Sequence, residues 1–151
     1  MLTLLVGAEG VCTKPHVIEF VLDFYEYAGS TILDSSNAIA LPNCNTSPIS
    51  EEGIQWFSLR GNGHELLVQT CGSDFDTVLQ VFSGSCFGLE CVRYNDDSCS
   101  LQSEVEFCAE DGVDYLIAVG GFGTDTGNFL LNIIDWGDCL QASSCEDIEF
   151  S

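Results

Sequence analysis

The sequence has almost no positive charge. Only three of its 151 residues are lysine or arginine, against 24 aspartates and glutamates, so the formal net charge is −21 at pH 7. Such a chain repels nucleic-acid phosphates and anionic lipid headgroups, because both carry charge of the same sign. The composition therefore excludes nucleic-acid binding by charge attraction, and we expect no nucleic acid among the partners.

Long apolar runs are absent as well. No stretch approaches the ~18 apolar residues of a membrane-spanning helix, so we expect no membrane insertion. Residues 1–8 have no basic region and too short an apolar run for a signal peptide. We therefore interpret the chain as a processed protein or as a module of a longer precursor. With 46% hydrophobic residues, it has enough apolar surface for one folded domain.

Cysteine, in contrast, is abundant. A zinc site needs closely paired cysteines and a second pair at a workable distance; Cys86 and Cys91 form one half of such a site, and neither His16 nor His64 completes it. Disulfides are the better interpretation, and they predict an extracellular location, secreted or at the cell surface. The sequon at Asn45 predicts a glycosylated loop. The nine cysteines, an odd number that leaves one thiol free or bound to another chain, are at positions 12, 44, 71, 86, 91, 99, 108, 139 and 145.

Short apolar stretches separated by Gly, Asn, Asp and Ser predict an all-β protein, an antiparallel sandwich of eight or nine strands without a convincing helix. In 16–27, the even-numbered apolar residues from Ile18 to Phe24 share one face. Helical spacing is the competing interpretation there, and the β-branched and aromatic content favours a strand. Alternation in 104–108 points Val105 and Phe107 inward. The expected strands are 16–27, 30–33, 54–60, 64–71, 77–82, 89–94, 104–108, 114–119 and 128–134.

Two turns predict hairpins. Gly61-Asn62-Gly63 separates two apolar runs, and Asn-Gly in that position is typical of a tight hairpin turn. A glycine-rich tip at 83–88 separates the next two runs.

The chain has no internal repeat and no linker that would divide it. The sandwich is expected to span residues 1–134, with 1–16 as an N-terminal extension or an exchanged strand. Residues 135–151 form an acidic, cysteine-containing tail that wraps the surface or reaches a neighbouring subunit.

Five segments resemble a known family in their order and spacing. They are WFSLRGNG, TCGSDFDTVLQVFSGSC, LECVRYNDD, EVEFCAEDGVDYLIAVGGF and GNFLL, and they lie within residues 55–134. Together they are similar to the bacterial pre-peptidase C-terminal domain (PPC domain) and its cysteine-bearing secreted relatives. The resemblance implies a jelly-roll β-sandwich that serves as an accessory extracellular module, often non-catalytic and sometimes stabilised by calcium. The chain departs from most members in its acidity and in standing without a visible enzyme domain.

Acidic side chains gather at two predicted loops, one before a strand and one after a strand. Aspartate side chains cap turns by accepting backbone N–H groups, whereas calcium needs ~6–8 oxygen ligands. Both interpretations stay open, because the regular spacing of an EF-hand loop is missing. If calcium is a cofactor, its expected ligands are Asp74, Asp76, Asn95, Asp96 and Asp97.

Cysteines are expected to pair where they bracket a tip or flank the same loops. One bridge closes the glycine-rich tip, a second anchors the N-terminal strand to a proline-containing loop, and a third closes a local loop in the tail. Cys71, Cys99 and Cys108 compete for a fourth, and their position beside the acidic loops favours the first two. The expected bridges are Cys86–Cys91, Cys12–Cys44, Cys139–Cys145 and Cys71–Cys99, with Cys108 left for an inward or interchain role.

Catalytic motifs are weak. Residues 84–88 (GSCFG) match a nucleophile elbow in letters, but an elbow joins a strand to a helix, whereas this stretch joins two strands. Neither His16 nor His64 has a recognisable nucleophilic residue as its partner, and no pair of carboxylates stands out for glycoside hydrolysis. Trp56 and Trp136 are expected in the core rather than on a sugar-binding platform. We therefore expect no catalytic residue.

The sequence favours a non-catalytic extracellular module, structural or adhesive, that assembles into a filament or surface layer. Edge strands offer unpaired N–H and C=O groups to other chains. The apolar strip 2–6 is a candidate for strand exchange with other copies or with other extracellular proteins. The alternative is an accessory domain that targets a secreted protein to a polysaccharide or protein polymer; a small hydrolase is the least favoured.

Overall fold

The computed structural model describes residues 10–32, 44, 49, 53–95 and 98–139. Over these residues the chain forms nine strands and no helix, hence none there that could cross a membrane. The strands are β1 (His16–Val17), β2 (Phe24–Ser30), β3 (Gln55–Arg60), β4 (His64–Gln69), β5 (Thr77–Ser83), β6 (Glu90–Asn95), β7 (Glu104–Ala109), β8 (Asp114–Gly121) and β9 (Asn128–Asp138).

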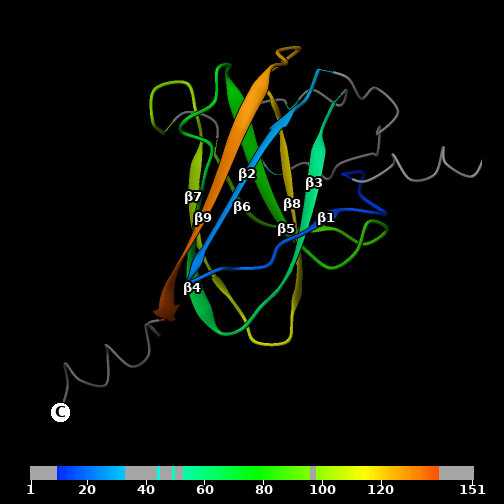
Figure 1. The fold of residues 1–151 in the computed structure, drawn as a ribbon. Coiled ribbons are helices and arrows are strands. Elements are labelled where there is room, and N and C mark those ends of the chain that lie inside the picture. Colours follow the sequence, from blue (N-terminus) through cyan, green and yellow to red (C-terminus); the bar gives the residue numbers. More distant parts are fainter. Residues whose placement is uncertain (1–9, 33–43, 45–48, 50–52, 96–97, 140–151) are drawn as a thin grey trace, which may run out of the picture.

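The strands form two sheets that face each other (Figure 1). One has five strands in the order β1-β3-β8-β5-β6, and the other has four in the order β2-β9-β4-β7. Every strand-to-strand connection except β5–β6 passes from one sheet to the other, a pattern typical of jelly-roll sandwiches. The predicted all-β sandwich is confirmed.

The main core lies between the inner faces of the sheets. Phe57 of β3, Leu66 of β4 and Ile133 of β9 are among its fully buried members. Val105 and Phe107 point inward as predicted, at 5% and 2% exposed. The alternation of apolar and polar residues in 104–108 therefore assigned the core face of this strand correctly, because side chains of a strand alternate between its two faces.

The predicted strand 16–27 is wrong as a single element. It is divided between β1 in the five-stranded sheet and β2 in the four-stranded sheet. The break is a two-residue turn in which Leu22 and Asp23 have φ of 53° and 66°, and Val21 and Phe24 exchange backbone hydrogen bonds of 2.9 and 3.1 Å. Two positive φ values define a type I′ turn, and this turn leaves Leu22 92% exposed rather than inward.

Other strand boundaries also differ from the prediction. Tyr25 and Tyr27, not Phe24, are the residues of β2 that pack against the core. Ser30 ends β2, so the predicted strand 30–33 does not form over its described residues. At the other end of the chain, β9 continues beyond Ile134 to Asp138.

The predicted hairpin at Gly61-Asn62-Gly63 is also wrong, because β3 and β4 belong to different sheets. The backbone N–H of Gly61 donates to the carbonyl of Val113, and that of Gly63 donates to Ala109, both at 2.8 Å. The turn thus packs on the β7–β8 connection, where a Cβ at position 61 would collide with the carbonyl of Glu110. The hairpin expected around the glycine-rich tip does form, between β5 and β6.

A second apolar cluster covers part of the outer face of the five-stranded sheet. Trp56, Phe82 and Leu116 point away from the main core and are buried there together with Cys12 and Cys44. Disulfides hold the covering segments in place: Cys12–Cys86 and Cys44–Cys91 tie two stretches from the first third of the chain to the β5–β6 hairpin. Covalent bridges therefore hold the segments that cover this part of the outer face.

Four disulfides are present among the described residues, and they correct most of the expected pairing. The Cys71–Cys99 bridge is confirmed. Cys108 pairs with Cys139: Cys108 lies opposite Glu65 and the end of β9 lies opposite His64, so both cysteines are near the start of β4. The expected bridges Cys86–Cys91, Cys12–Cys44 and Cys139–Cys145 are wrong, as is a free Cys108.

Several predicted features lie outside the described residues. They are the apolar strip 2–6, the sequon at Asn45, the candidate ligands Asp96 and Asp97, and Cys145.

Candidate functional site

A groove of about 730 Å³ opens at the end of the five-stranded sheet where β3 ends and β8 begins. Its residues come from the stretch around Cys12, from β1 and the residues after it, from the paired ends of β3 and β8, and from the β5–β6 tip. The Cys12–Cys86 disulfide joins two of these segments. Residues that line the groove include Val17, Phe20, Arg60, Phe87, Asp114 and Leu116.

The groove is apolar, with a neutral polar rim. Val17 and Phe87 are 65% and 88% exposed, so two of its segments offer apolar surface to solvent. At the rim, Arg60 Nη1 donates to Asp114 Oδ1 at 2.9 Å, and both side chains are exposed. An exposed pair of this kind stabilises little, but it cancels the charge beside the groove. The site therefore suits apolar side chains.

The groove lies beside an edge of the sheet. β1 is the last strand of its sheet and runs parallel to β3, with which it pairs through His16 and Val17. Its other side is paired with no strand of the described chain, and an edge of this kind can accept an extended segment from another chain. The geometry combines an apolar groove with a free strand edge.

A second cluster surrounds His64 at the start of β4. Its Nδ1–H donates to both carboxylate oxygens of Asp135 at 2.8 Å, and its Nε2 lies 3.4 Å from Asp138 Oδ1. The backbone N–H of Gly137 donates to Asp135 Oδ1 at 2.8 Å. The Asp135 side chain is only 5% exposed, whereas that of His64 is 31% exposed. The cluster joins the end of β9 to the start of β4.

These contacts shift both pKa values in the directions expected for an ion pair. The hydrogen bond to Asp135 raises the pKa of His64 above its ordinary 6.5, and the charges of Asp135, Asp138 and Asp23 add to the rise against partial burial. Burial alone would raise the pKa of Asp135, but the hydrogen bonds from His64 and Gly137 outweigh it and lower the pKa. His64 is therefore a cation over a wider pH range than a free histidine.

The pair should give a pH-dependent contribution to stability. The His64 contribution is complete below the unfolded pKa of about 6.5 and is lost as pH rises through its higher folded value; the Asp135 contribution is lost as pH falls through a folded value below about 3.9. The pair is thus most stabilising between roughly pH 4 and 6.5. In an NMR titration of the His64 ring protons, Asp135→Asn should lower the pKa, and Asp138→Asn should lower it by less. Equal pKa values in the three proteins would contradict this assignment.

A His–Asp pair supplies two of the three members of a hydrolytic triad, but the described residues bring no nucleophile to it. The neighbouring cysteines, Cys108 and Cys139, are bridged. The cysteine of the elbow-like motif, Cys86, is also in a disulfide and lies on a strand-to-strand tip, so it offers no thiolate. The motif is a structural tip.

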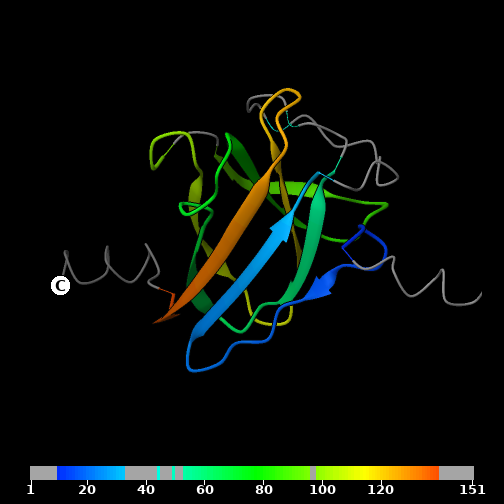
Figure 2. The ribbon, with the colours of Figure 1, turned by 45° about the horizontal axis from the view of Figure 1, so that its top comes forward.

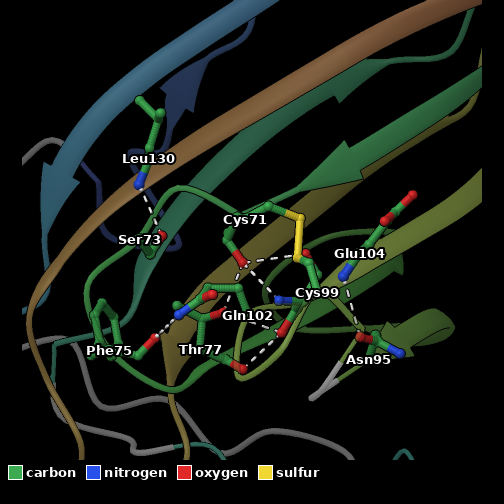
Figure 3. Close-up of a disulfide and its surroundings, with 11 residues drawn as sticks. Cys71, Ser73, Phe75, Thr77, Asn95, Cys99, Gln102, Glu104 and Leu130 are labelled. Carbon is green, nitrogen blue, oxygen red and sulfur yellow. Dashed lines mark hydrogen bonds between the residues drawn. A yellow bond between two sulfur atoms is a disulfide. The ribbon is translucent and has the colours of Figure 1, made fainter.

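Two of the three described members of the predicted calcium set cap backbone groups with their side chains. Asp74 Oδ1 accepts from the N–H of Asn128 at 3.0 Å. Asn95 Oδ1 accepts from the N–H of Glu104 at 3.2 Å (Figure 3). Asp76 accepts from Phe122 through its backbone carbonyl. These contacts agree with the turn-capping interpretation for Asp74 and Asn95, and calcium binding stays a prediction.

The same region is fixed by polar contacts around the Cys71–Cys99 disulfide (Figure 3). Gln102 Nε2 donates to the carbonyl of Phe75, and the N–H of Leu130 donates to Ser73 Oγ. Buried beside them, the hydroxyls of Thr70 and Thr77 lie 2.7 Å apart. One further cluster of candidate metal ligands among the described residues, Glu65 with Cys108 and Cys139, contains a disulfide and so lacks thiolates.

Sequence reasoning missed both the groove and the His64 cluster. The groove brings together residues within 12–20, 58–62, 84–87 and 114–116, which are distant in the sequence, and His64 and Asp135 are 71 positions apart. One sequence feature could have indicated the groove. Phe87 lies in a glycine-rich tip, where few neighbouring side chains can bury an aromatic ring.

The fold has counterparts among solved structures. PliG of Aeromonas hydrophila, a periplasmic inhibitor of g-type lysozyme, aligns with a TM-score of 0.56 at 12% identity over 85% of this chain and 99% of PliG. The pre-peptidase C-terminal domain of a Bacillus anthracis collagenase gives 0.44 at 12% identity over 79% and 95% of the two chains. A Yersinia pseudotuberculosis-derived mitogen gives 0.40 at 15% over 81% and 93%.

No protein-family model and no curated protein sequence matches the chain. At 12% identity, the likeness to PliG shows the fold alone. The chain is a small β-sandwich domain with four disulfides among its described residues, and such bridges persist in oxidising compartments, outside the cell or in a periplasm. Membership of the PPC family remains a prediction from the sequence.

Proposed function

We propose that the protein is a non-catalytic, secreted binding module that takes an extended apolar segment of another chain into the groove beside β1. The observation that carries the proposal is the coincidence of exposed apolar side chains with a strand edge: Val17 belongs to both. Backbone groups of the edge give affinity to an added strand, and pockets beside it select side chains. A solved structure with a similar fold, PliG, is that of a periplasmic inhibitor of g-type lysozyme.

The segment that fits this chemistry within the chain is the apolar strip 2–6 of another copy. Exchange from one copy to the next is head-to-tail, so it builds an open filament rather than a closed dimer. The net charge of −21 opposes close approach of copies, and salt or multivalent cations relieve that repulsion. An accessory role, with the groove on a polysaccharide or protein polymer, is the alternative.

Sedimentation velocity over a range of concentrations, in buffer of moderate salt, tests this proposal. The wild-type protein should associate as its concentration rises, and Phe87→Asp or Val17→Asp should weaken association at least about tenfold, because each places a charge on the apolar contact. Leu101→Asp is the matched control: Leu101 is 52% exposed but lies outside the groove, so association should not change.

Two results would overturn self-association through the groove. One is a wild-type monomer at every concentration and salt level; the other is equal weakening by Leu101→Asp and Phe87→Asp. If the protein is instead a monomer that binds an insoluble polysaccharide, and Phe87→Asp abolishes this binding, the accessory role replaces self-association as the proposed function.

A further inference from the structure

The four-stranded sheet carries an apolar row on its outer face. Phe24 of β2 pairs with Ile134 of β9, and Ile134 pairs with Leu67 of β4, so three apolar side chains lie side by side across three strands. The residues before and after Leu67 face the core. Because side chains alternate along a strand, Leu67 and its row must face away from it.

Two aromatic side chains stand out from this face. Phe24 is 40% exposed, and Trp136, which follows Ile134 by two residues on the same strand, is 55% exposed. The sequence placed Trp136 in the core, but β9 extends past Ile134 and carries the indole outward. In Figures 1 and 2, β2 and β9 lie side by side at the front of the molecule, and no described segment crosses them.

The charges around the row are all negative. Glu106 pairs with Leu67 and continues the row onto β7, while Glu26, Glu65 and Glu104 occupy adjacent outward positions. The chain has only three lysines and arginines. Lys14, Arg60 and Arg93 all lie on or next to strands of the other sheet, and among the described residues none of them forms an ion pair with these carboxylates.

We propose that this acid–aromatic face, made by Phe24, Glu26, Glu106, Ile134 and Trp136 over the buried Leu67, docks an arginine-rich protein segment that also carries apolar side chains. Uncompensated carboxylates attract cationic partners and repel anionic ones. Arginine fits best because its planar guanidinium stacks on an indole and pairs with carboxylates in a two-pronged geometry, which a lysine ammonium does not. The exposed rings of Phe24 and Trp136 receive the partner's apolar side chains. This surface is separate from the groove and does not depend on the role proposed for it.

The test uses three synthetic peptides of equal length: one alternating arginine and leucine, one with lysine for arginine, and one with serine for leucine. Binding is followed by titration into isotopically labelled protein in NMR spectra and by the change in tryptophan fluorescence, to which only the exposed Trp136 responds because Trp56 is fully buried. The arginine–leucine peptide should bind best and shift amide signals on β2, β4, β7 and β9.

Matched variants separate this face from general charge attraction. Trp136→Ser should weaken binding about tenfold, and Glu106→Lys should weaken it several-fold and reduce its salt dependence. Glu90→Lys changes an exposed glutamate of β6, on the other sheet, and should alter binding by less than about twofold. Thermal unfolding confirms that each variant is folded, as expected for exposed positions.

Three outcomes would overturn the proposal. They are equal binding of the three peptides, equal effects of Glu90→Lys and Glu106→Lys, and signal shifts confined to the groove residues Val17 and Phe87. None of these outcomes bears on self-association, which the sedimentation experiment measures without peptide.

Discussion

Phe57→Ala should remove about 3–5 kcal/mol from the free energy of unfolding. Phe57 is fully buried and packs edge-to-face against Tyr27 and Phe129, at ring-centroid distances of 5.2 and 6.2 Å. Removal of the ring leaves a cavity between the two sheets, and it also removes aromatic contacts that contribute beyond the buried area. Because small domains have only ~5–15 kcal/mol of stability, this loss is a large share of it.

Chemical denaturation gives the measurement, with Phe87→Ala as the control. Phe87 is 88% exposed, so its truncation should change stability by no more than ~0.5 kcal/mol. A loss of similar size in both variants would mean that the main core does not lie between these two sheets.

Removal of the Cys12–Cys86 bridge should destabilise the protein by about 2–4 kcal/mol. The two cysteines are 74 residues apart in the sequence, so the bridge restricts a long stretch of the unfolded chain. Cys44–Cys91 restricts much of the same region, which favours the lower part of that range. We expect the Cys12→Ser/Cys86→Ser double variant to show this loss in chemical denaturation.

The bridge should also protect Trp56, because Cys12 covers the cluster in which that side chain is buried. With Trp136→Phe as the background, acrylamide should quench Trp56 more strongly in the double variant than in the parent. The control is Cys71→Ser/Cys99→Ser, which removes a bridge with a sequence separation of 28 outside that cluster and should leave quenching unchanged. Increased quenching in both variants would contradict a local covering role.

The disulfide pairs show which bridges the sequence could predict and which it could not. The Cys71–Cys99 bridge was predictable, because both cysteines lie beside the acidic loops in the sequence. Cys86 and Cys91 bracket a hairpin tip and were expected to pair, yet each binds a cysteine from the first third of the chain. Local sequence shows which cysteines are close along the chain, but a bridge forms between those that the folded backbone brings within about 6 Å at Cα.

The His64–Asp135 pair and the outward position of Trp136 could not be predicted from local sequence either. Both depend on the pairing of the extended β9 with β4, where the register shifts between His64 and Leu66. Such a shift is a β-bulge, which re-aims the side chains beyond it. Nothing in the spacing of these residues along the sequence specifies it.

The sequence by itself indicated the all-β class, the disulfide-bonded state of most cysteines and the inward residues of strand 104–108. These properties follow from composition and from the two-residue alternation of a strand, and both are local. Only the tertiary structure decided which strands share a sheet, which cysteines meet, and where the groove and the acid–aromatic face lie. Every connection but one crosses between the sheets, so contacts between residues far apart in the chain, which local patterns do not encode, set those outcomes.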